Sequence, residues 1–191
     1  MNKILIFDAD GVTIKLREKF FSQRLSEDYG ISSELVIPLF KNEFYKCVLG
    51  EMDLKEVLKK YIIIWKWKGT IDELLEYWWQ GESQLNIEVI EEIKKLRKNG
   101  DKVYLATDQE KYRANNLMQN VGLKNYLDGA FFSYELKLSK ATKVFWIKVL
   151  ELLGNPDPKD VKFFDDEKEN VEAALQVGVD AVIFQNPHKI C

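Results

Sequence analysis

The chain has 191 residues, of which 46% are hydrophobic and 31% are charged, a composition typical of one folded globular domain and not of a disordered chain. Its 28 Lys and Arg against 31 Asp and Glu give a net charge of −3, so the chain has no overall basic field for a nucleic acid backbone. Every apolar run is shorter than the ~20 residues of a membrane span, and the first is too short for a signal peptide. We therefore expect neither nucleic acid nor membrane partners.

The cysteine and histidine content indicates no metal clip. Cys47 and Cys191 lie far apart, a spacing that predicts neither a disulfide framework nor a metal site. Cys47 falls in a helical apolar stripe and is expected in the core, while His188 and Cys191 are expected to be tail residues. This usage favours a reducing cytoplasm. Nothing in the pattern indicates an oligomeric state.

The first predicted element is a short buried strand at residues 3–7 that ends at two acidic residues. Asp8 and Asp10 follow it on alternate positions, and Gly11 implies that the backbone bends there. Ligands of parallel sheets lie at the carboxyl ends of the strands, so Asp8 is expected at the mouth of the sheet. Two neighbouring anions need a cation between them, which predicts a hard metal such as Mg2+, an ammonium group, or both. The alternative for this stretch alone is an ordinary turn after a strand.

Residues 15–85 carry a helical pattern throughout. Asp53 with Glu56, and Thr70 with Glu73, have the spacing of capping boxes before amphipathic stripes. Another stripe, with Phe40, Phe44 and Val48, is expected to begin near Pro38, because proline is tolerated in the first turn of a helix.

From residue 86 the pattern alternates between helices and short apolar strands. Asn86 is expected to cap a helix that stops at residues 99–100. The strands are expected at 103–106, 130–132, 161–164 and 181–184, and the intervening helices at 110–121, from Lys140 to Gly154, and at 171–177.

This order predicts an α/β fold, a doubly wound parallel five-stranded (Rossmann-like) sheet with an inserted α-helical cap subdomain. Residues 1–14 and 86–191 would form the α/β core domain, and residues 15–85 the cap. Since the insertion follows the first strand at its carboxyl end, it is placed to cover a site there.

Polar residues follow the strands at the points where they end. Because the carboxyl ends of parallel strands share one edge, we expect these side chains to converge there: Asp8, Asp10, Thr107, Lys140, Asp165 and Asp166. Carboxylates without His or Cys select a hard cation such as Mg2+, whose charge suits a phosphate dianion together with a lysine. Asp8 can attack phosphorus while Asp10 gives a proton to the leaving oxygen and then takes one from water. The pattern thus indicates phosphoryl transfer from a small phosphorylated metabolite.

These residues resemble the motifs of the haloacid dehalogenase (HAD) superfamily of aspartate-nucleophile phosphatases, over the whole chain. Asp-Ala-Asp-Gly-Val-Thr at 8–13 resembles the first motif of the family, and Leu-Ala-Thr-Asp at 105–108 resembles the second. Lys140 resembles the third motif, and the acidic segment 164–170 resembles the fourth. Two positions depart from the pattern, because Asp108 and Ala141 stand where related sequences often have Asn and Pro. Asp108 adds a negative charge near the expected phosphate pocket.

The resemblance implies a role for each matching residue. Asp8 would be the nucleophile and Asp10 the acid/base, with the backbone carbonyl of Asp10 on Mg2+. Thr107, Asp108 and Lys140 form the expected phosphate-binding group. The expected metal site consists of Asp8, Asp10, Asp165 and Asp166. Lys137 and Lys143 lie close to Lys140 in sequence, so that the identity of the site lysine stays open.

Asp10 favours phosphate ester hydrolysis within this superfamily. A halide leaves unaided, and the dehalogenases resemble a pattern with Tyr at this position, whereas an alkoxide leaving group needs a proton donor. A phosphomutase stays open, because it uses the same aspartyl phosphate but returns the group to a sugar.

Two alternatives from other classes also stay open. A receiver-like signalling module shares the acidic pair, Thr and Lys, but is shorter and presents them in another order. A catalytically weak HAD-like interaction protein would use the four tryptophans of the insertion as a binding face: Trp65, Trp67, Trp78 and Trp79. The competing interpretation is that Trp65 and Trp78 are core residues of the cap.

Overall fold

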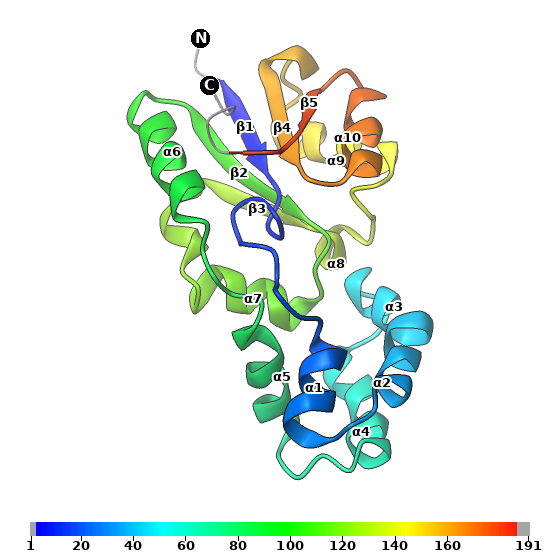
Figure 1. Cartoon of the computed structure of the whole chain (residues 1–191). Helices are drawn as coiled ribbons and strands as arrows, with labels where there is room; N and C mark the ends of the chain where they lie inside the picture. The colour runs from blue at the N-terminus through cyan, green and yellow to red at the C-terminus, as the bar shows by residue number, and fades with distance from the viewer. Residues whose placement is uncertain (1–2, 187–191) are drawn as a thin grey trace.

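The computed structural model describes residues 3–186, and its centre is a five-stranded parallel sheet (Figure 1). His188 and Cys191 lie outside the described residues. The strand order is β3-β2-β1-β4-β5. The strands are β1 (Ile4–Phe7), β2 (Lys102–Thr107), β3 (Gly129–Phe132), β4 (Val161–Asp165) and β5 (Asp180–Ile183). The predicted doubly wound α/β sheet is therefore confirmed.

β1 lies in the middle of the sheet, which explains its uniformly apolar sequence. It pairs with β2 on one side and β4 on the other, with Phe7 in register with Leu105 and Phe164. Both faces of a central parallel strand are covered by helices, so each of its side chains must be apolar. Asp8 is the first residue after this strand and therefore stands at the centre of the sheet edge.

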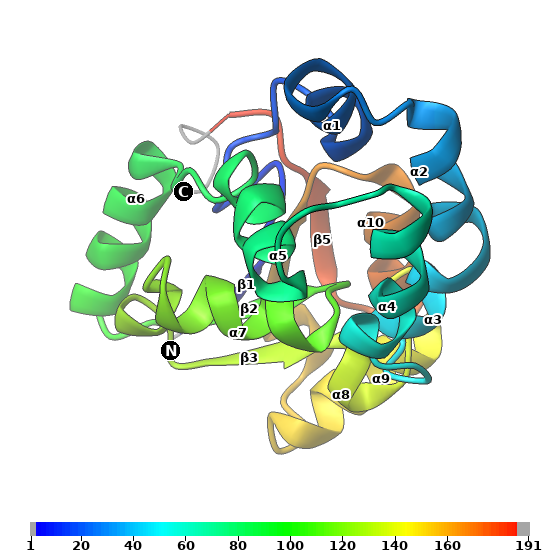
Figure 2. The same cartoon turned by 90° about the horizontal axis from the view of Figure 1, so that it is seen from below.

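Helices cover both faces of the sheet. Figure 2 shows α6 and α10 on opposite sides of the strands. On one face α6 (Ile87–Lys98) and α7 (Lys111–Gln119) bury Ile90, Ile93 and Leu117 in a shared cluster with Leu5 and Phe7. On the other face lie α9 (Lys143–Leu152) and α10 (Lys168–Leu175). The short elements are the helical turn α8 (Ser133–Leu136) and the two 3-10 turns, η2 (Leu123–Asn125) and η3 (Pro158–Asp160).

Residues 21–80 form a second group of helices with its own core. Its elements are α1 (Phe21–Tyr29), α2 (Ser33–Leu39), the π-helical turn η1 (Phe40–Phe44), α3 (Tyr45–Val48), α4 (Leu54–Ile64) and α5 (Ile71–Gln80). Trp65 and Trp78 are buried in this cluster, together with Cys47, as expected. Trp67 and Trp79 are half-buried and pack against its edge. Two of the four tryptophans are thus committed to packing.

The predicted helix starts at Asp53 and Thr70 are confirmed. The Asp53 side chain accepts hydrogen bonds from the N–H groups of Lys55 and Glu56. Thr70 and Glu73 form a complete capping box, in which each side chain binds the backbone of the other. These bonds satisfy amide groups that have no partner within the helix.

Two local predictions were wrong, and a third was confirmed in position but not in its hydrogen bond. Pro38 lies near the end of α2 instead of opening a helix, and the π-helical turn follows directly, which is consistent with proline lacking an N–H and crowding the preceding turn. Lys140 lies in a loop, because α9 begins at Lys143. Asn86 occupies the expected cap position, but its side-chain amide donates instead to the carbonyl of Val12 at 3.0 Å.

The two connections between the sheet and the helices of residues 21–80 run side by side. Ile14 and Leu85 form an antiparallel bridge, and the N–H of Lys15 donates to the Gln84 carbonyl at 2.8 Å. In the part of the chain that the structure describes, every helix is too short or too polar to cross a bilayer.

Candidate active site

Asp8 is buried at the end of β1, within a turn that its own backbone organises. Its N–H donates to the Phe164 carbonyl of β4 at 2.9 Å, and its carbonyl accepts from the Thr13 hydroxyl at 3.0 Å. The carboxylate oxygen Oδ1 accepts the N–H of Ala9 at 2.7 Å. The side chain is therefore held in one orientation, with only 4% of the residue exposed.

Lys140 lies between two of the predicted carboxylates. Its Nζ is 2.5 Å from Oδ2 of Asp8 and 2.7 Å from Oδ2 of Asp165, and all three side chains are buried. Burial raises the pKa of Asp8, and the Lys140 ammonium opposes that rise. Burial alone would lower the pKa of Lys140, but the Asp8 and Asp165 anions raise it above its ordinary value. The structure therefore places Lys140 at the acidic cluster.

The acidic pair at the end of β4 divides into one residue tied to the protein and one that is more open. Asp165 is fully buried, and its Oδ1 accepts hydrogen bonds from the N–H of Glu167 at 2.8 Å and from Asn170 Nδ2 at 3.0 Å. Asp166 is only half-buried. Burial and the neighbouring Asp165 anion raise the pKa of Asp166, so a nearby cation would stabilise its charged form.

The acidic cluster has a donor set that fits Mg2+. Carboxylate oxygens of Asp8, Asp165 and Asp166 lie within 4.8 Å of one another. Hard oxygen ligands of this kind suit Mg2+, and a divalent cation would offset their mutual repulsion. The carboxylate of Asp10 is not part of this group. The resemblance implies the backbone carbonyl of Asp10, not its carboxylate, as a ligand.

Gly11 makes room for Asp166 at this cluster. It has φ +79°, a conformation that favours glycine, and a Cβ built on it would lie 2.2 Å from Oδ2 of Asp166. The bend expected from Gly11 thus lets the first loop approach the β4 carboxylate closely.

Thr107 is the last residue of β2 and is 1% exposed. Its hydroxyl stands at the carboxyl edge of the sheet and can donate a hydrogen bond to a ligand oxygen there.

Asp108 holds the Lys140 loop. Its Oδ2 accepts the Ser139 hydroxyl at 2.6 Å, and its Oδ1 accepts the backbone N–H of Lys140 at 2.9 Å. Both oxygens are therefore used within the protein. Asp108, which stands where related sequences often have Asn, therefore positions the loop that carries Lys140.

The Asp10 carboxylate contacts two residues that sequence reasoning did not single out. Gln109 Nε2 donates to its Oδ2 at 2.7 Å, and Arg113 Nη2 lies 3.7 Å from its Oδ1. Gln109 follows the second motif by one residue and Arg113 lies one helical turn further on. Their closeness to Thr107 in the sequence was the one indication that these two residues could lie near the site. Their pairing with Asp10 depends on the fold.

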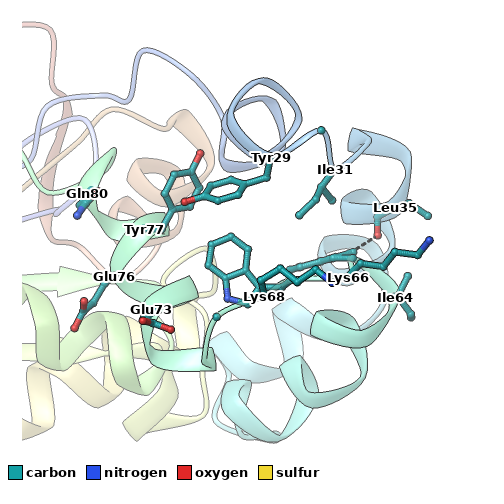
Figure 3. Close-up of a pocket in the computed structure, with 14 residues that line it drawn as sticks. Tyr29, Ile31, Leu35, Ile64, Lys66, Lys68, Glu73, Glu76, Tyr77 and Gln80 are labelled. Carbon is teal, nitrogen blue, oxygen red and sulfur yellow. Dashed lines mark hydrogen bonds between the residues drawn. The ribbon is translucent and has the colours of Figure 1, made fainter.

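A cavity of about 910 Å3 lies in the helices of residues 21–80 (Figure 3). Its lining includes none of the three carboxylates of the acidic cluster. Its wall includes Tyr29, Trp67 and Tyr77, whose rings pack against one another. These rings therefore bury part of their surface against one another. The cavity is a separate feature from the site formed by the carboxylates.

Comparison with known proteins places this arrangement in a family. Residues 2–178 match the model of the haloacid dehalogenase-like hydrolases. The phosphorylated carbohydrates phosphatase of Thermotoga maritima is 27% identical, with 93% of this chain and 82% of that protein covered.

Two solved structures share the fold. A HAD family enzyme from Bacteroides thetaiotaomicron, in complex with magnesium and inorganic phosphate, has a TM-score of 0.82 at 19% identity, covering 97% of this chain and 95% of that one. A HAD phosphatase from Thermococcus onnurineus has a TM-score of 0.64 at 24% identity, covering 97% and 86%.

These findings confirm the predicted superfamily and the prediction of a phosphatase-type enzyme. The four motif positions found in the sequence all lie at the carboxyl edge of the sheet or in the loops beside it. The chain belongs to the haloacid dehalogenase-like hydrolases.

Proposed function

We propose that this protein is a Mg2+-dependent phosphatase that hydrolyses small phosphate monoesters through an aspartyl phosphate on Asp8. The observation that carries the proposal is the buried arrangement of Asp8, Lys140 and Asp165, with the Lys140 ammonium 2.5 Å from the Asp8 carboxylate. A carboxylate held rigidly beside a fixed cation is suited to attack an anionic phosphorus centre.

The first chemical step forms an aspartyl phosphate. An oxygen of Asp8 attacks phosphorus, and the bond from phosphorus to the ester oxygen breaks with its electron pair going to that oxygen. Lys140 stabilises the negative charge on the phosphoryl oxygens, and the Thr107 hydroxyl donates a hydrogen bond to one of them. Asp10 gives its proton to the leaving oxygen, so that an alcohol departs.

The second step releases phosphate. Asp10, now ionised, takes a proton from water, and the water oxygen attacks phosphorus and displaces the Asp8 carboxylate. Asp8 and Asp166, with Asp165 and the backbone carbonyl of Asp10, would hold the Mg2+ ion. When bound, Mg2+ supplies positive charge that neutralises the phosphoryl oxygens.

We further propose that residues 15–85 act as a cap over a core domain of residues 1–14 and 86–191. The separate hydrophobic cluster around Trp65 and Trp78 supports this division, as do the paired connections at Ile14 and Leu85. A sugar phosphate is the proposed substrate class, because the Thermotoga maritima relative acts on phosphorylated carbohydrates. The cytoplasmic location stays a prediction from the cysteine content.

A phosphatase screen tests this function. We expect release of inorganic phosphate from p-nitrophenyl phosphate with Mg2+, loss of that release in excess EDTA, and a preference for sugar phosphates over nucleotides and small phosphorylated acids. Free phosphate as the product distinguishes hydrolysis from a phosphomutase reaction. Full activity in EDTA, or no turnover of any phosphate ester, would contradict the proposal.

Asp166→Ala should raise the Mg2+ concentration needed for half-maximal activity, on the order of tenfold or more, because a carboxylate ligand is lost from the cluster. Turnover at saturating Mg2+ should fall less. Titrating Mg2+ against activity measures the effect, and Glu169→Ala, which removes an exposed carboxylate from α10, is the matched control. An unchanged Mg2+ dependence would place Asp166 outside the metal site.

Asp10→Asn should harm esters of weakly acidic alcohols most. We expect a loss of about a hundredfold or more on alkyl phosphates and a smaller loss on p-nitrophenyl phosphate, because nitrophenolate leaves with little help from an acid. Since water activation is also impaired, a burst of product followed by a slow phase should appear. Equal losses on both substrates without a burst would leave Asp10 no acid/base role.

A further inference from the structure

The Asp10 carboxylate is held from two sides by residues of the segment that follows β2. The Gln109 amide donates to Oδ2 at 2.7 Å, and the Arg113 guanidinium lies 3.7 Å from Oδ1. The Asp10 side chain is about one-third exposed, at 32%, whereas that of Arg113 is 5% exposed. The carboxylate thus reaches toward solvent while its two partners are anchored in the protein.

Both partners are themselves fixed. The Gln109 N–H donates to the buried Ser133 hydroxyl at 3.0 Å, which in turn donates to the Val48 carbonyl at 2.7 Å. Arg113 Nη1 donates to Ser83 Oγ at 3.1 Å and to Asn116 Oδ1 at 3.2 Å. The backbone of Gln109 is thus anchored and the residue is 8% exposed, so packing confines its side chain, while hydrogen bonds confine the side chain of Arg113. Confined side chains can hold a third group in place, because they have already lost their own rotamer freedom.

Arg113 also connects Asp10 with the returning connection from the helices of residues 21–80. Its Nη2 donates to the Glu82 carbonyl, and Nη1 binds Ser83. These two residues directly precede Gln84, whose carbonyl pairs with Lys15 of the outgoing connection. The same guanidinium therefore contacts the Asp10 carboxylate and the segment that leads back from the helices to the sheet.

We propose that Gln109 and Arg113 are positioning residues that hold the Asp10 carboxylate in its orientation for proton transfer, with Arg113 tying that orientation to the connection at residues 82–83. The proposal rests on the acid/base role given to Asp10 under the proposed function. A proton donor contributes most when its geometry is set before the reaction, because misplacement by about 1 Å is costly to rate. Gln109 and Arg113 act on the reaction only through Asp10.

Gln109→Met tests this proposal, because methionine keeps similar length and bulk but cannot donate a hydrogen bond. Phenyl phosphate and p-nitrophenyl phosphate are suitable probes, since they are similar in shape but differ in the basicity of the leaving oxygen. We expect kcat for phenyl phosphate to fall about tenfold, kcat for p-nitrophenyl phosphate to fall less, and KM and the Mg2+ requirement to stay unchanged. Gln119→Met, on the exposed face of α7, is the matched control.

A double-mutant cycle separates positioning from a general structural role. In the Asp10→Asn background, Gln109→Met should cause no further loss on phenyl phosphate, because the group through which it acts is already disabled. Arg113→Lys keeps the charge but cannot contact Asp10, Ser83 and Glu82 together, and it should give the same substrate-dependent loss. Lysine is chosen over an uncharged residue because loss of the buried positive charge of Arg113 would endanger folding.

Three outcomes would overturn the proposal: additive losses in the double mutant, equal losses on the two substrates, or an unchanged kcat in both Gln109→Met and Arg113→Lys. The phosphatase activity of the wild-type protein tests the proposed function separately from the positioning roles of Gln109 and Arg113. Phosphatase activity that Asp8→Asn abolishes upholds that function on its own, and the three outcomes then count against positioning alone. No phosphatase activity in the wild type removes both.

Discussion

We expect Asp8→Asn to lower turnover of p-nitrophenyl phosphate by about a thousandfold or more, because an amide oxygen cannot replace the carboxylate as a nucleophile toward phosphorus. The substitution is nearly isosteric, and Asp165 still lies 2.7 Å from the Lys140 ammonium, so the fold should be retained. Steady-state kinetics at saturating Mg2+ gives the rate, and thermal unfolding shows whether the variant is folded.

The matched control for this prediction is Asp180→Asn, which makes the same chemical change at an exposed residue of β5. It should keep nearly full turnover. A further check is the covalent intermediate itself, since the wild-type protein should acquire a phosphoryl group on Asp8 that the variant lacks. Comparable turnover by Asp8→Asn would assign the attack to another carboxylate or to water.

Lys140→Met should be costly to both activity and stability. Methionine fits the volume but leaves the carboxylates of Asp8 and Asp165 facing each other in a buried site without their cation. Removing one partner of a buried ionic group typically costs about 3–5 kcal/mol in the free energy of unfolding. Loss of a charged group that stabilises phosphoryl oxygens should lower turnover by roughly a hundredfold to a thousandfold.

Urea unfolding without Mg2+ and kinetics at saturating Mg2+ measure the two effects separately. Lys143→Met provides the control, because Lys143 is an exposed neighbour that was an alternative candidate for the site lysine. It should match the wild type in both measurements. If Lys143→Met lost activity and Lys140→Met did not, the phosphate-binding role of Lys140 would be wrong.

The amino-acid sequence by itself determined the sheet and the positions at which its strands end. Buried parallel strands are mostly apolar, so that a polar residue at the end of an apolar run, such as Asp8 or Thr107, marks the end of the strand. Helix starts at Asp53 and Thr70 were equally local, since a capping side chain binds amide groups only two or three residues away. Short-range rules of this kind need no knowledge of the tertiary structure.

Only the tertiary structure decided which polar groups meet. Lys140 is paired with Asp8, 132 positions earlier in the chain, and Lys143 is exposed, although both belong to the same short lysine-rich stretch. The orientation of Asp108 toward Ser139 and Lys140 was equally hidden, because a side chain after a strand can face either the pocket or the next loop. Which of these side chains contact one another depends on the distances between loops at the carboxyl edge of the sheet.

The contacts of Asp10 show the same limit. Gln109 and Arg113 carry no motif, and their pairing with Asp10 requires that β2 lie beside β1 in register and that α7 start close to the strand end. Pro38 is a second case, since packing of the surrounding helical cluster outweighs its local preference for a first turn. The sequence determined the chemistry available at the sheet edge from local patterns, whereas long-range packing decided how those groups are held.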